Sequence, residues 1–249
     1  MGDNTQLSSV SRTLAKLYSA IAVNIAYRLA PAHNFPTAAY DTHDTIIWLS
    51  KNASSLGAEL SKGFILLGAS AGANLAAVTS QKWISTRSSP PITGVSLAVP
   101  WLLSSEIVPE EYKDLWLSRE QDQDAMILNK AAIAYMMAAY EPDVHSPEFS
   151  PFNTPRAHRG LPLVHIQVCG SDPLRDDGLL YEKVMRDHGV KTRMEVYPGV
   201  PHGFSLFRGL PLAKRSFFDE ILAIGWLLGD EKTEEDIEQL LPDDDYLSI

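Results

Sequence analysis

Cysteine, basic residues and long apolar runs are all scarce in this sequence of 249 residues. Cys169 is the only cysteine, which excludes a disulfide within the chain and zinc sites built on cysteine pairs, and fits a reducing compartment. No run of about 18 apolar residues is present to cross a bilayer. The opening residues MGDNTQLSS lack the basic and apolar stretches of an export signal. We therefore expect a cytoplasmic protein without a membrane span.

The shortage of basic residues also limits the partners that the chain could bind. Lysine and arginine number 21 against 31 acidic residues, and the net charge is -10. Most of that charge lies in residues 230–249, so the body of the chain is close to neutral. No basic patch interleaved with aromatic residues is present to follow phosphates, which argues against nucleic acid as a partner. A small molecule fits this composition better.

Five short runs rich in apolar and β-branched residues are typical of strands, namely residues 21–27, 64–69, 92–99, 163–170 and 192–199. Helix-length stretches separate most of them, at about residues 36–53, 71–86, 177–188 and 213–228. This alternation predicts an α/β fold, a mostly parallel sheet with helices on both faces. We expect one domain over residues 1–229 and an acidic, solvated C-terminal tail over residues 230–249.

The alternation stops in one long insertion, at about residues 101–160. Two helical patterns occur there, at residues 110–121 and 126–140, and a proline-rich segment follows at residues 146–162. We expect this insertion to form a helical lid. The alternative is a pair of ordinary packing helices, because methionines and aromatic residues in the second pattern could belong to the core.

The motif G-x-S-x-G occurs once, at residues 68–72. In a nucleophile elbow this motif forms a sharp turn between a strand and a helix, which lifts the serine hydroxyl clear of the sheet. The pattern is short enough to arise by chance. Here, however, a strand-like run precedes it and a helix-like run follows it, as the chemistry requires. We therefore predict that Ser70 is a nucleophile; a glycine-rich turn made for packing is the alternative.

An activated serine needs a base within hydrogen-bond reach and a carboxylate that orients the base. Among seven histidines, His202 alone follows the final predicted strand, where a loop could bring it over the strand ends. His165 lies within a strand and is expected to be a core residue, and His188 resembles a residue at a helix C-terminus. His202 is thus the predicted base.

The predicted acid is Asp172, which directly follows the strand at residues 163–170. The carboxyl ends of parallel strands meet at one edge of the sheet, so Asp172 would share that edge with the serine and the base. Asp176 and Asp177 are rivals. They fall near the start of the next helix, where a capping or first-turn role explains them without catalysis.

These residues together resemble the hormone-sensitive-lipase family of α/β-hydrolases, which includes carboxylesterases and arylacetamide deacetylase-like enzymes. The matching segments are YRLAP at residues 27–31, GASAGANLA at 68–76, DPLRDDG at 172–178 and HGF at 202–204. The resemblance implies an α/β-hydrolase fold and ester hydrolysis through an acyl-serine, with Ser70, Asp172 and His202 on the catalytic positions. Ala32, Ala69 and Ala73 depart from the family pattern outside those positions.

The resemblance also implies that an N-terminal segment is missing, namely the N-terminal strands, the oxyanion glycine loop and the N-terminal part of the lid. In the family, a histidine and three glycines stand shortly before a Gly-Asp pair that residues 2–3 resemble, and the glycine amides form most of the oxyanion hole. We therefore expect an N-terminally truncated chain in which residues 4–19 form the next helix and Ala71 supplies the one identifiable oxyanion amide. Losing one donor costs about 10²- to 10³-fold in rate, so activity would be impaired.

A gap in the sheet follows from the same expectation, because the family places the missing strand between those at residues 21–27 and 64–69. Three options remain open: the two strands pair directly, another chain donates a strand and gives a homo-oligomer, or the sequence is incomplete.

Three functions compete at this point. The first is a serine carboxylic ester hydrolase acting on small or medium acyl esters. The second is a non-hydrolytic relative, either a ligand-binding pseudoenzyme or a cyclase or lyase that uses His202 as a base. The third is a purely structural or interaction role. None of them requires a cofactor or a metal, and no residue set suggests one.

Overall fold

The computed structural model describes residues 5–241, the side chains of residues 155 and 157 excepted. Four parallel strands form one sheet in the order β1-β2-β3-β4. Their bounds are β1 Ile65–Ala69, β2 Gly94–Ala98, β3 Leu163–Ser171 and β4 Thr192–Pro201. Each strand after the first is reached through a crossover, as a parallel sheet requires. The α/β-hydrolase architecture predicted from the sequence is therefore present in its central part.

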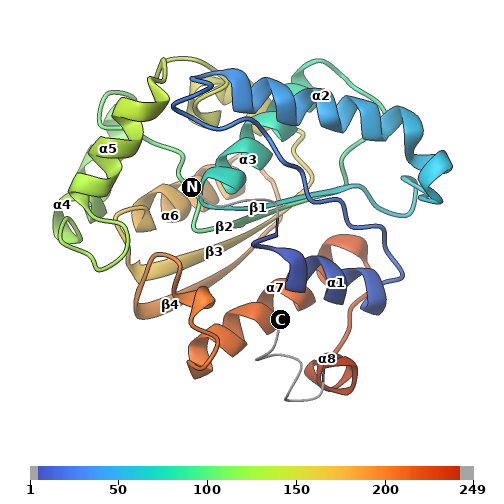
Figure 1. Cartoon of the computed structure of the whole chain (residues 1–249). Helices are drawn as coiled ribbons and strands as arrows, with labels where there is room; N and C mark the ends of the chain where they lie inside the picture. The colour runs from blue at the N-terminus through green and yellow to red at the C-terminus, as the bar shows by residue number, and fades with distance from the viewer. Residues whose placement is uncertain (1–4, 242–249) are drawn as a thin grey trace.

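Helices cover both faces of this sheet (Figure 1). On one face α3 packs against β1 and β2, α6 packs against β3, and α2 lies on α3. On the other face α7 packs against β2, β3 and β4, while α1 and α8 pack against α7. The bounds are α1 Ser8–Leu17, α2 Thr37–Asn52, α3 Ala71–Ser85, α6 Arg175–Asp187, α7 Pro211–Leu228 and α8 Glu234–Leu240.

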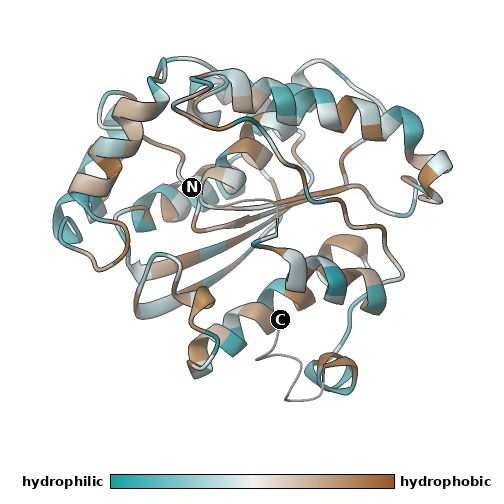
Figure 2. Cartoon of the chain, in the orientation of Figure 1, coloured by the Kyte–Doolittle hydropathy of each residue, from teal (hydrophilic) through white to brown (hydrophobic). Residues whose placement is uncertain are grey.

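The alternation of side chains along the strands divides the interior into two layers. Val95 and Leu97 of β2, with Ile166 of β3, belong to the main apolar core between the sheet and α3 and α6. The intervening residues of these strands face α7 and include buried polar side chains such as Ser96 and His165. Figure 2 shows hydrophobic residues along the middle of the sheet between helices of mixed polarity, whereas the edge strand β4 is itself of mixed polarity.

The predicted strand at residues 21–27 is not formed. This segment connects α1 to α2 and belongs to no sheet among the described residues. Ile25 packs against the main core, whereas Ile21 and Val23 are 48% and 46% exposed. A β-branched run becomes a strand only when a neighbouring strand takes up its backbone hydrogen bonds. Direct pairing of this segment with β1, one of the three options raised by the sequence, is therefore not what the structure adopts.

The insertion at residues 101–160 contains short helices rather than the two long ones that the pattern predicts. The first pattern is divided into η2 Glu110–Leu115 and α4 Ser118–Gln121, and the second becomes α5 Lys130–Tyr140. The proline-rich part forms two single turns, η3 Pro151–Asn153 and η4 Pro155–His158. No residue of α5 is buried, so this helix is not a core element. The alternative of ordinary packing helices therefore does not fit α5.

Within the predicted acidic C-terminal tail, the structure forms the helix α8 Glu234–Leu240, and residues 242–249 lie outside the described residues. Thr233 begins α8 with a capping box, in which its side chain and that of Asp236 bond reciprocally to the backbone. Ile237 is fully buried against α1 and α7. Leu240 and Leu241 join Ile237 in this apolar cluster, so the helix docks despite its acidic surroundings. No helix within residues 5–241 is long and apolar enough to cross a membrane.

Candidate active site

Ser70 sits at a tight turn between β1 and α3. Its backbone has φ 54° and ψ -116°, a conformation that non-glycine residues rarely adopt. The turn is held by the Ser70 N–H, which donates to the carbonyl of Ala98 on β2 at 2.8 Å. A Cβ at position 68 would lie 2.2 Å from the Gly72 carbonyl oxygen, so Gly68 is required for the chain to turn this sharply. This is the geometry of a nucleophile elbow.

The second glycine of the motif is not required by close contact. A Cβ built at Gly72 meets no atom within 4 Å among the described residues. The sequence argument that only small residues fit on both sides of the serine therefore applies here to Gly68 alone.

Asp172 follows β3 at an irregular point of the sheet. The pairing of β3 with β4 shifts between Cys169 and Ser171, and such irregularities change the direction of the residues that follow them. A side chain at Gly170 would come within 2.9 Å of the Gly199 backbone nitrogen, so the two chains approach closely there. Asp172 is fully buried and accepts the Leu174 N–H at 2.9 Å, which fixes one of its two carboxylate oxygens.

His202 follows β4 and links the other two residues. Its Nδ1 lies 2.7 Å from Asp172 Oδ2, and its Nε2 lies 3.0 Å from Ser70 Oγ. A carboxylate only accepts hydrogen bonds, so Nδ1 carries the proton and the unprotonated Nε2 accepts from the serine hydroxyl. The loop is fixed by Phe204, which packs in a small cluster with Tyr197 of β4. The structure thus brings the three predicted residues into one chain of hydrogen bonds.

The backbone amide of Ala71, predicted to be an oxyanion donor, lies directly after the serine. Ala71 is the first residue of α3 and is exposed. An N–H in the first turn of a helix has no partner within the helix, and the helix dipole favours negative charge there. The position therefore suits a group that carries developing negative charge beside Ser70.

The two rival carboxylates have other partners. Asp177 is fully buried and accepts the backbone N–H groups of Leu102 and Leu103 at 2.8 and 2.9 Å, together with bonds from Trp116 and Arg119. Burial raises the pKa of this carboxyl group, and the nearby Arg119 guanidinium opposes the rise. Asp177 thus attaches the start of the insertion to α6.

Asp176 also attaches the first half of the insertion to α6. Its Oδ2 accepts the N–H groups of Leu117 and Ser118 at 2.7 and 2.6 Å, and its Oδ1 accepts Arg175 Nε at 2.8 Å. Neither Asp176 nor Asp177 contacts His202 through any hydrogen bond among the described residues. The predicted role at the start of the helix does not include these contacts, because the backbone amides that bond to the two carboxylates lie more than 50 positions away in the sequence.

Asn74 is a further residue whose role was not predicted from the sequence. Its side-chain nitrogen donates to the carbonyls of Trp101 and Phe149 at 2.8 and 2.7 Å. It therefore joins the first turn of α3, next to the serine, to both ends of the insertion. The asparagine lies inside the motif GASAGANLA, and a polar residue one turn after the serine was the available signal.

A pocket of about 380 Å³ opens beside the loop that carries His202. Residues 121–126 of the insertion form one wall, and Ser171, Gly199 and Pro201 form the other. No group of three or more histidine, cysteine, aspartate or glutamate side chains within residues 5–241 could hold a metal ion.

The chain is similar to several known proteins. A family described as having the alpha/beta hydrolase fold matches residues 1–206. An AB hydrolase superfamily protein of Schizosaccharomyces pombe is 36% identical over 229 residues, which are 92% of this chain and 68% of that protein. Versiconal hemiacetal acetate esterase of Dothistroma septosporum is 30% identical over 224 residues, 88% of this chain and 67% of that protein.

Two solved structures extend the comparison. The crystal structure of vibralactone cyclase superposes with a TM-score of 0.85 at 36% identity, and the match covers 92% of this chain and 67% of that one. An esterase of Pyrobaculum calidifontis superposes with a TM-score of 0.78 at 29% identity, over 91% of this chain and 72% of that one. The chain spans about two thirds of the length of these relatives. It belongs to the α/β-hydrolase fold family, among relatives of the hormone-sensitive-lipase and carboxylesterase type.

Proposed function

We propose that the chain is a serine carboxylic ester hydrolase in which Ser70 is the nucleophile, His202 the general base and Asp172 the residue that orients the base. One observation carries the proposal: Ser70 Oγ lies 3.0 Å from His202 Nε2, while His202 Nδ1 lies 2.7 Å from Asp172 Oδ2. Esterase relatives, such as versiconal hemiacetal acetate esterase, support the same reaction class.

In this mechanism the Ser70 hydroxyl attacks the ester carbonyl and its proton passes to His202 Nε2. The C–O bond of the ester then breaks, and His202 returns the proton to the leaving alcohol. A water molecule attacks the resulting acyl-serine, again losing a proton to His202, and the released Ser70 regains it. The products are one alcohol and one carboxylic acid, as hydrolysis requires.

The Ala71 amide would stabilise the negative charge on the carbonyl oxygen in each tetrahedral intermediate. It is the one donor that we assign within residues 5–241, and each oxyanion donor contributes about 10²- to 10³-fold in rate. We therefore expect turnover to be slow relative to a site with further donors. Small or medium acyl esters are the expected substrates, with the insertion acting as a lid above the strand ends.

A fluorophosphonate probe tests this function, because it reacts only with an activated serine. We expect the probe to label Ser70, no labelling of the Ser70→Ala variant, and turnover of p-nitrophenyl acetate by the unmodified chain alone. Absence of labelling in protein with a native circular dichroism spectrum would instead support a ligand-binding pseudoenzyme.

A cyclase is the second candidate, because the vibralactone cyclase structure matches this chain with a TM-score of 0.85. In such a reaction a nucleophile within the substrate takes the place of water, and His202 still moves the proton. Hydrolysis adds one water to the substrate, whereas cyclisation does not. Mass spectrometry of products from hydroxy esters therefore distinguishes the two reactions: products that contain no added water would favour the cyclase.

A further inference from the structure

The peptide group between Pro173 and Leu174 lies next to Asp172 and joins two sets of hydrogen bonds. Its N–H, which belongs to Leu174, donates to Asp172 Oδ1 at 2.9 Å. Its carbonyl, which belongs to Pro173, accepts the hydroxyl of Ser118 at 2.8 Å and Nη1 of Arg119 at 3.1 Å. Ser118 and Arg119 are the first two residues of α4 in the insertion. One peptide group therefore connects the insertion to the carboxylate of the candidate active site.

This peptide group transmits a constraint from one side to the other because it is planar. It is trans, so its carbonyl and its N–H point in nearly opposite directions. The bonds that hold the Pro173 carbonyl therefore also direct the Leu174 N–H toward Asp172. Hydrogen bonds to a carbonyl polarise its peptide group and strengthen the bond that the N–H donates. The other oxygen of Asp172 bonds to His202 Nδ1 at 2.7 Å, so the chain of bonds extends from α4 to His202.

The two side chains that hold the carbonyl are themselves fixed. Ser118 is fully buried. The Arg119 guanidinium lies over the rings of Trp101 and Trp116, with its central carbon 5.6 and 5.4 Å from the two ring centroids. Its Nη2 donates to Asp177 Oδ2 at 3.0 Å. Both donors to the carbonyl are therefore held in one orientation and largely shielded from water.

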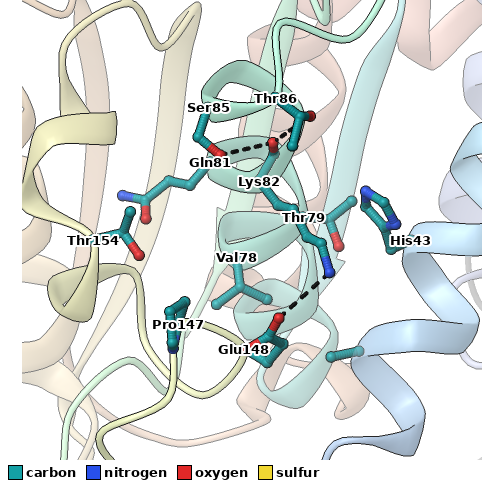
Figure 3. Close-up of a pocket in the computed structure, with 11 residues that line it drawn as sticks. His43, Val78, Thr79, Gln81, Lys82, Ser85, Thr86, Pro147, Glu148 and Thr154 are labelled. Atoms are coloured by element: carbon teal, nitrogen blue, oxygen red, sulfur yellow. Dashed lines mark hydrogen bonds and ion pairs between the residues drawn. The ribbon is translucent and has the colours of Figure 1, made fainter.

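The later part of the insertion is attached elsewhere. Lys82 of α3 pairs with Glu148 at 3.4 Å (Figure 3), and Gln81 of the same helix bonds to His158 at 2.7 Å. Neither contact involves the segment that follows β3. Attachment of the insertion and orientation of Asp172 are therefore separable functions, and α4 is the part of the insertion that serves the second.

We propose that Ser118 and Arg119 are positioning residues for Asp172. Their bonds to the Pro173 carbonyl turn the N–H of the same peptide group toward Asp172, which keeps this carboxylate aligned with His202. This inference rests on the ester hydrolase proposed above. The insertion thus takes part in orienting the acid, in addition to its proposed role as a lid.

Ser118→Ala is the first test, because it removes one of the two bonds to the Pro173 carbonyl and little volume. We expect kcat for p-nitrophenyl acetate to fall about three- to tenfold with KM unchanged, since a small misalignment of Asp172 acts on the chemical step. Arg119→Lys should lower kcat at least as much. Lysine keeps the charge beside Asp177, but it lacks the planar fork that reaches two acceptors at once.

Trp116→Phe is the matched control. It removes the bond from Trp116 Nε1 to Asp177 Oδ1, which is 2.8 Å long, and so loosens the same part of the insertion. It keeps an aromatic ring beside Arg119 and leaves both bonds to the Pro173 carbonyl in place. The control should therefore have the kcat of the unmodified chain. An equal loss of kcat in this control would overturn the proposal, because general loosening of the insertion would then explain all three variants.

The proton on His202 Nδ1 gives a second readout, which does not depend on turnover. Its nuclear magnetic resonance signal and its rate of exchange with solvent report how well the bond to Asp172 is kept. Exchange should be faster in Ser118→Ala and Arg119→Lys than in Trp116→Phe and the unmodified chain. Identical exchange in all four proteins would rule out the positioning role. If exchange responds as expected but the unmodified chain has no turnover, the result counts against the ester hydrolase alone.

Discussion

Within residues 5–241, two clusters each join a serine, a histidine and a carboxylate by hydrogen bonds, and they lie in different surroundings. The first is Ser70, His202 and Asp172 at the carboxyl ends of the strands. The second, which we call the buried serine cluster, is Ser96, His165, Glu195 and Glu220. In this cluster Ser96 Oγ lies 2.7 Å from His165 Nδ1, and His165 Nε2 lies 2.6 Å from Glu195 Oε2. The distances are as short as those at the strand ends.

Two differences separate the clusters chemically. Ser96 and His165 are both fully buried in the middle of their strands beneath α7, where no substrate can approach. The Ser96 hydroxyl also donates its one proton to Glu220 at 2.6 Å, so it has none to give to the histidine. A hydrogen bond between a serine and a histidine is therefore not sufficient to identify a catalytic serine. Position at the strand ends and a free hydroxyl proton are required as well.

The strongest test of this comparison replaces each serine by alanine. Ser70→Ala should lower turnover of p-nitrophenyl acetate by about 10³-fold or more, because the nucleophile is lost. Ser96→Ala should leave the turnover per folded molecule unchanged. Steady-state kinetics on both variants measures this, and a large loss of activity in Ser96→Ala with the native fold retained would erase the distinction between the clusters.

Replacing the histidines should have the opposite pattern of effects, with the larger loss in the buried serine cluster and in stability rather than in activity. His165→Gln should lower the free energy of unfolding by about 3 kcal/mol, because Glu195 and the Ser96–Glu220 pair lose a buried partner. His202→Gln should change it by less than about 1 kcal/mol, since a side-chain amide can still donate to Asp172. Urea denaturation provides the measurement. Equal destabilisation by the two substitutions would mean that the buried serine cluster has no special structural role.

A second buried histidine, His158, extends the comparison to the dependence of stability on pH. His158 accepts from Gln81 at 2.7 Å, and burial lowers its pKa to about 4. The unfolded chain therefore binds more protons than the folded one between about pH 6.5 and pH 4, so stability falls as the pH falls through this range. The expected loss is about 3 kcal/mol.

Urea midpoints at a series of pH values would show this dependence. His158→Phe should be less stable at neutral pH but should lose less stability on acidification. If the stability of that variant falls with pH as steeply as that of the unmodified chain, groups other than His158 cause the acid sensitivity.

The smallest expected effect concerns stability and is found by comparing substitutions of two carboxylates of α6, Asp177 and Asp187. Asp177→Asn should cost about 2 kcal/mol, because the amide nitrogen would face the N–H groups of Leu102 and Leu103. It should also make the insertion easier to cleave in limited proteolysis. Asp187→Asn is the control, since Asp187 forms only an exposed ion pair with Lys183 on the same helix. A similar change in both variants would show that Asp177 does not hold the insertion in place.

Much of the fold could be predicted because local pattern and tertiary structure agree. The strands at residues 64–69, 92–99, 163–170 and 192–199 were predicted from apolar runs, and each found parallel neighbours. The run at residues 21–27 has the same composition, but it has no neighbouring strand. Strand formation depends on pairing, which composition alone does not report. The short helix α8 was missed because acidic composition concealed the capping box and a single buried isoleucine.

The candidate site could be predicted where chain order and sheet topology decide it. Ser70, Asp172 and His202 each follow a strand, and parallel strands place such residues at one edge. The contacts that attach the insertion could not be predicted in this way. They join carboxylates of α6 to backbone amides of a distant segment, and backbone amides carry no sequence signal. The same limit applies to Ser96 and His165, whose pairing depends on the register between β2 and β3.

The position of β1 at the edge of the described sheet has a consequence for amide hydrogen exchange. The Phe64 carbonyl and the Ser70 N–H both bond toward β2, so Ile65, Leu67 and Ala69 direct their N–H groups away from it. Amide protons of these three residues should exchange with deuterium much faster than those of Leu66 and Gly68. The strand that carries Ser70 would thus show alternating protection, and slow exchange at all five positions would report a further strand bound at this edge.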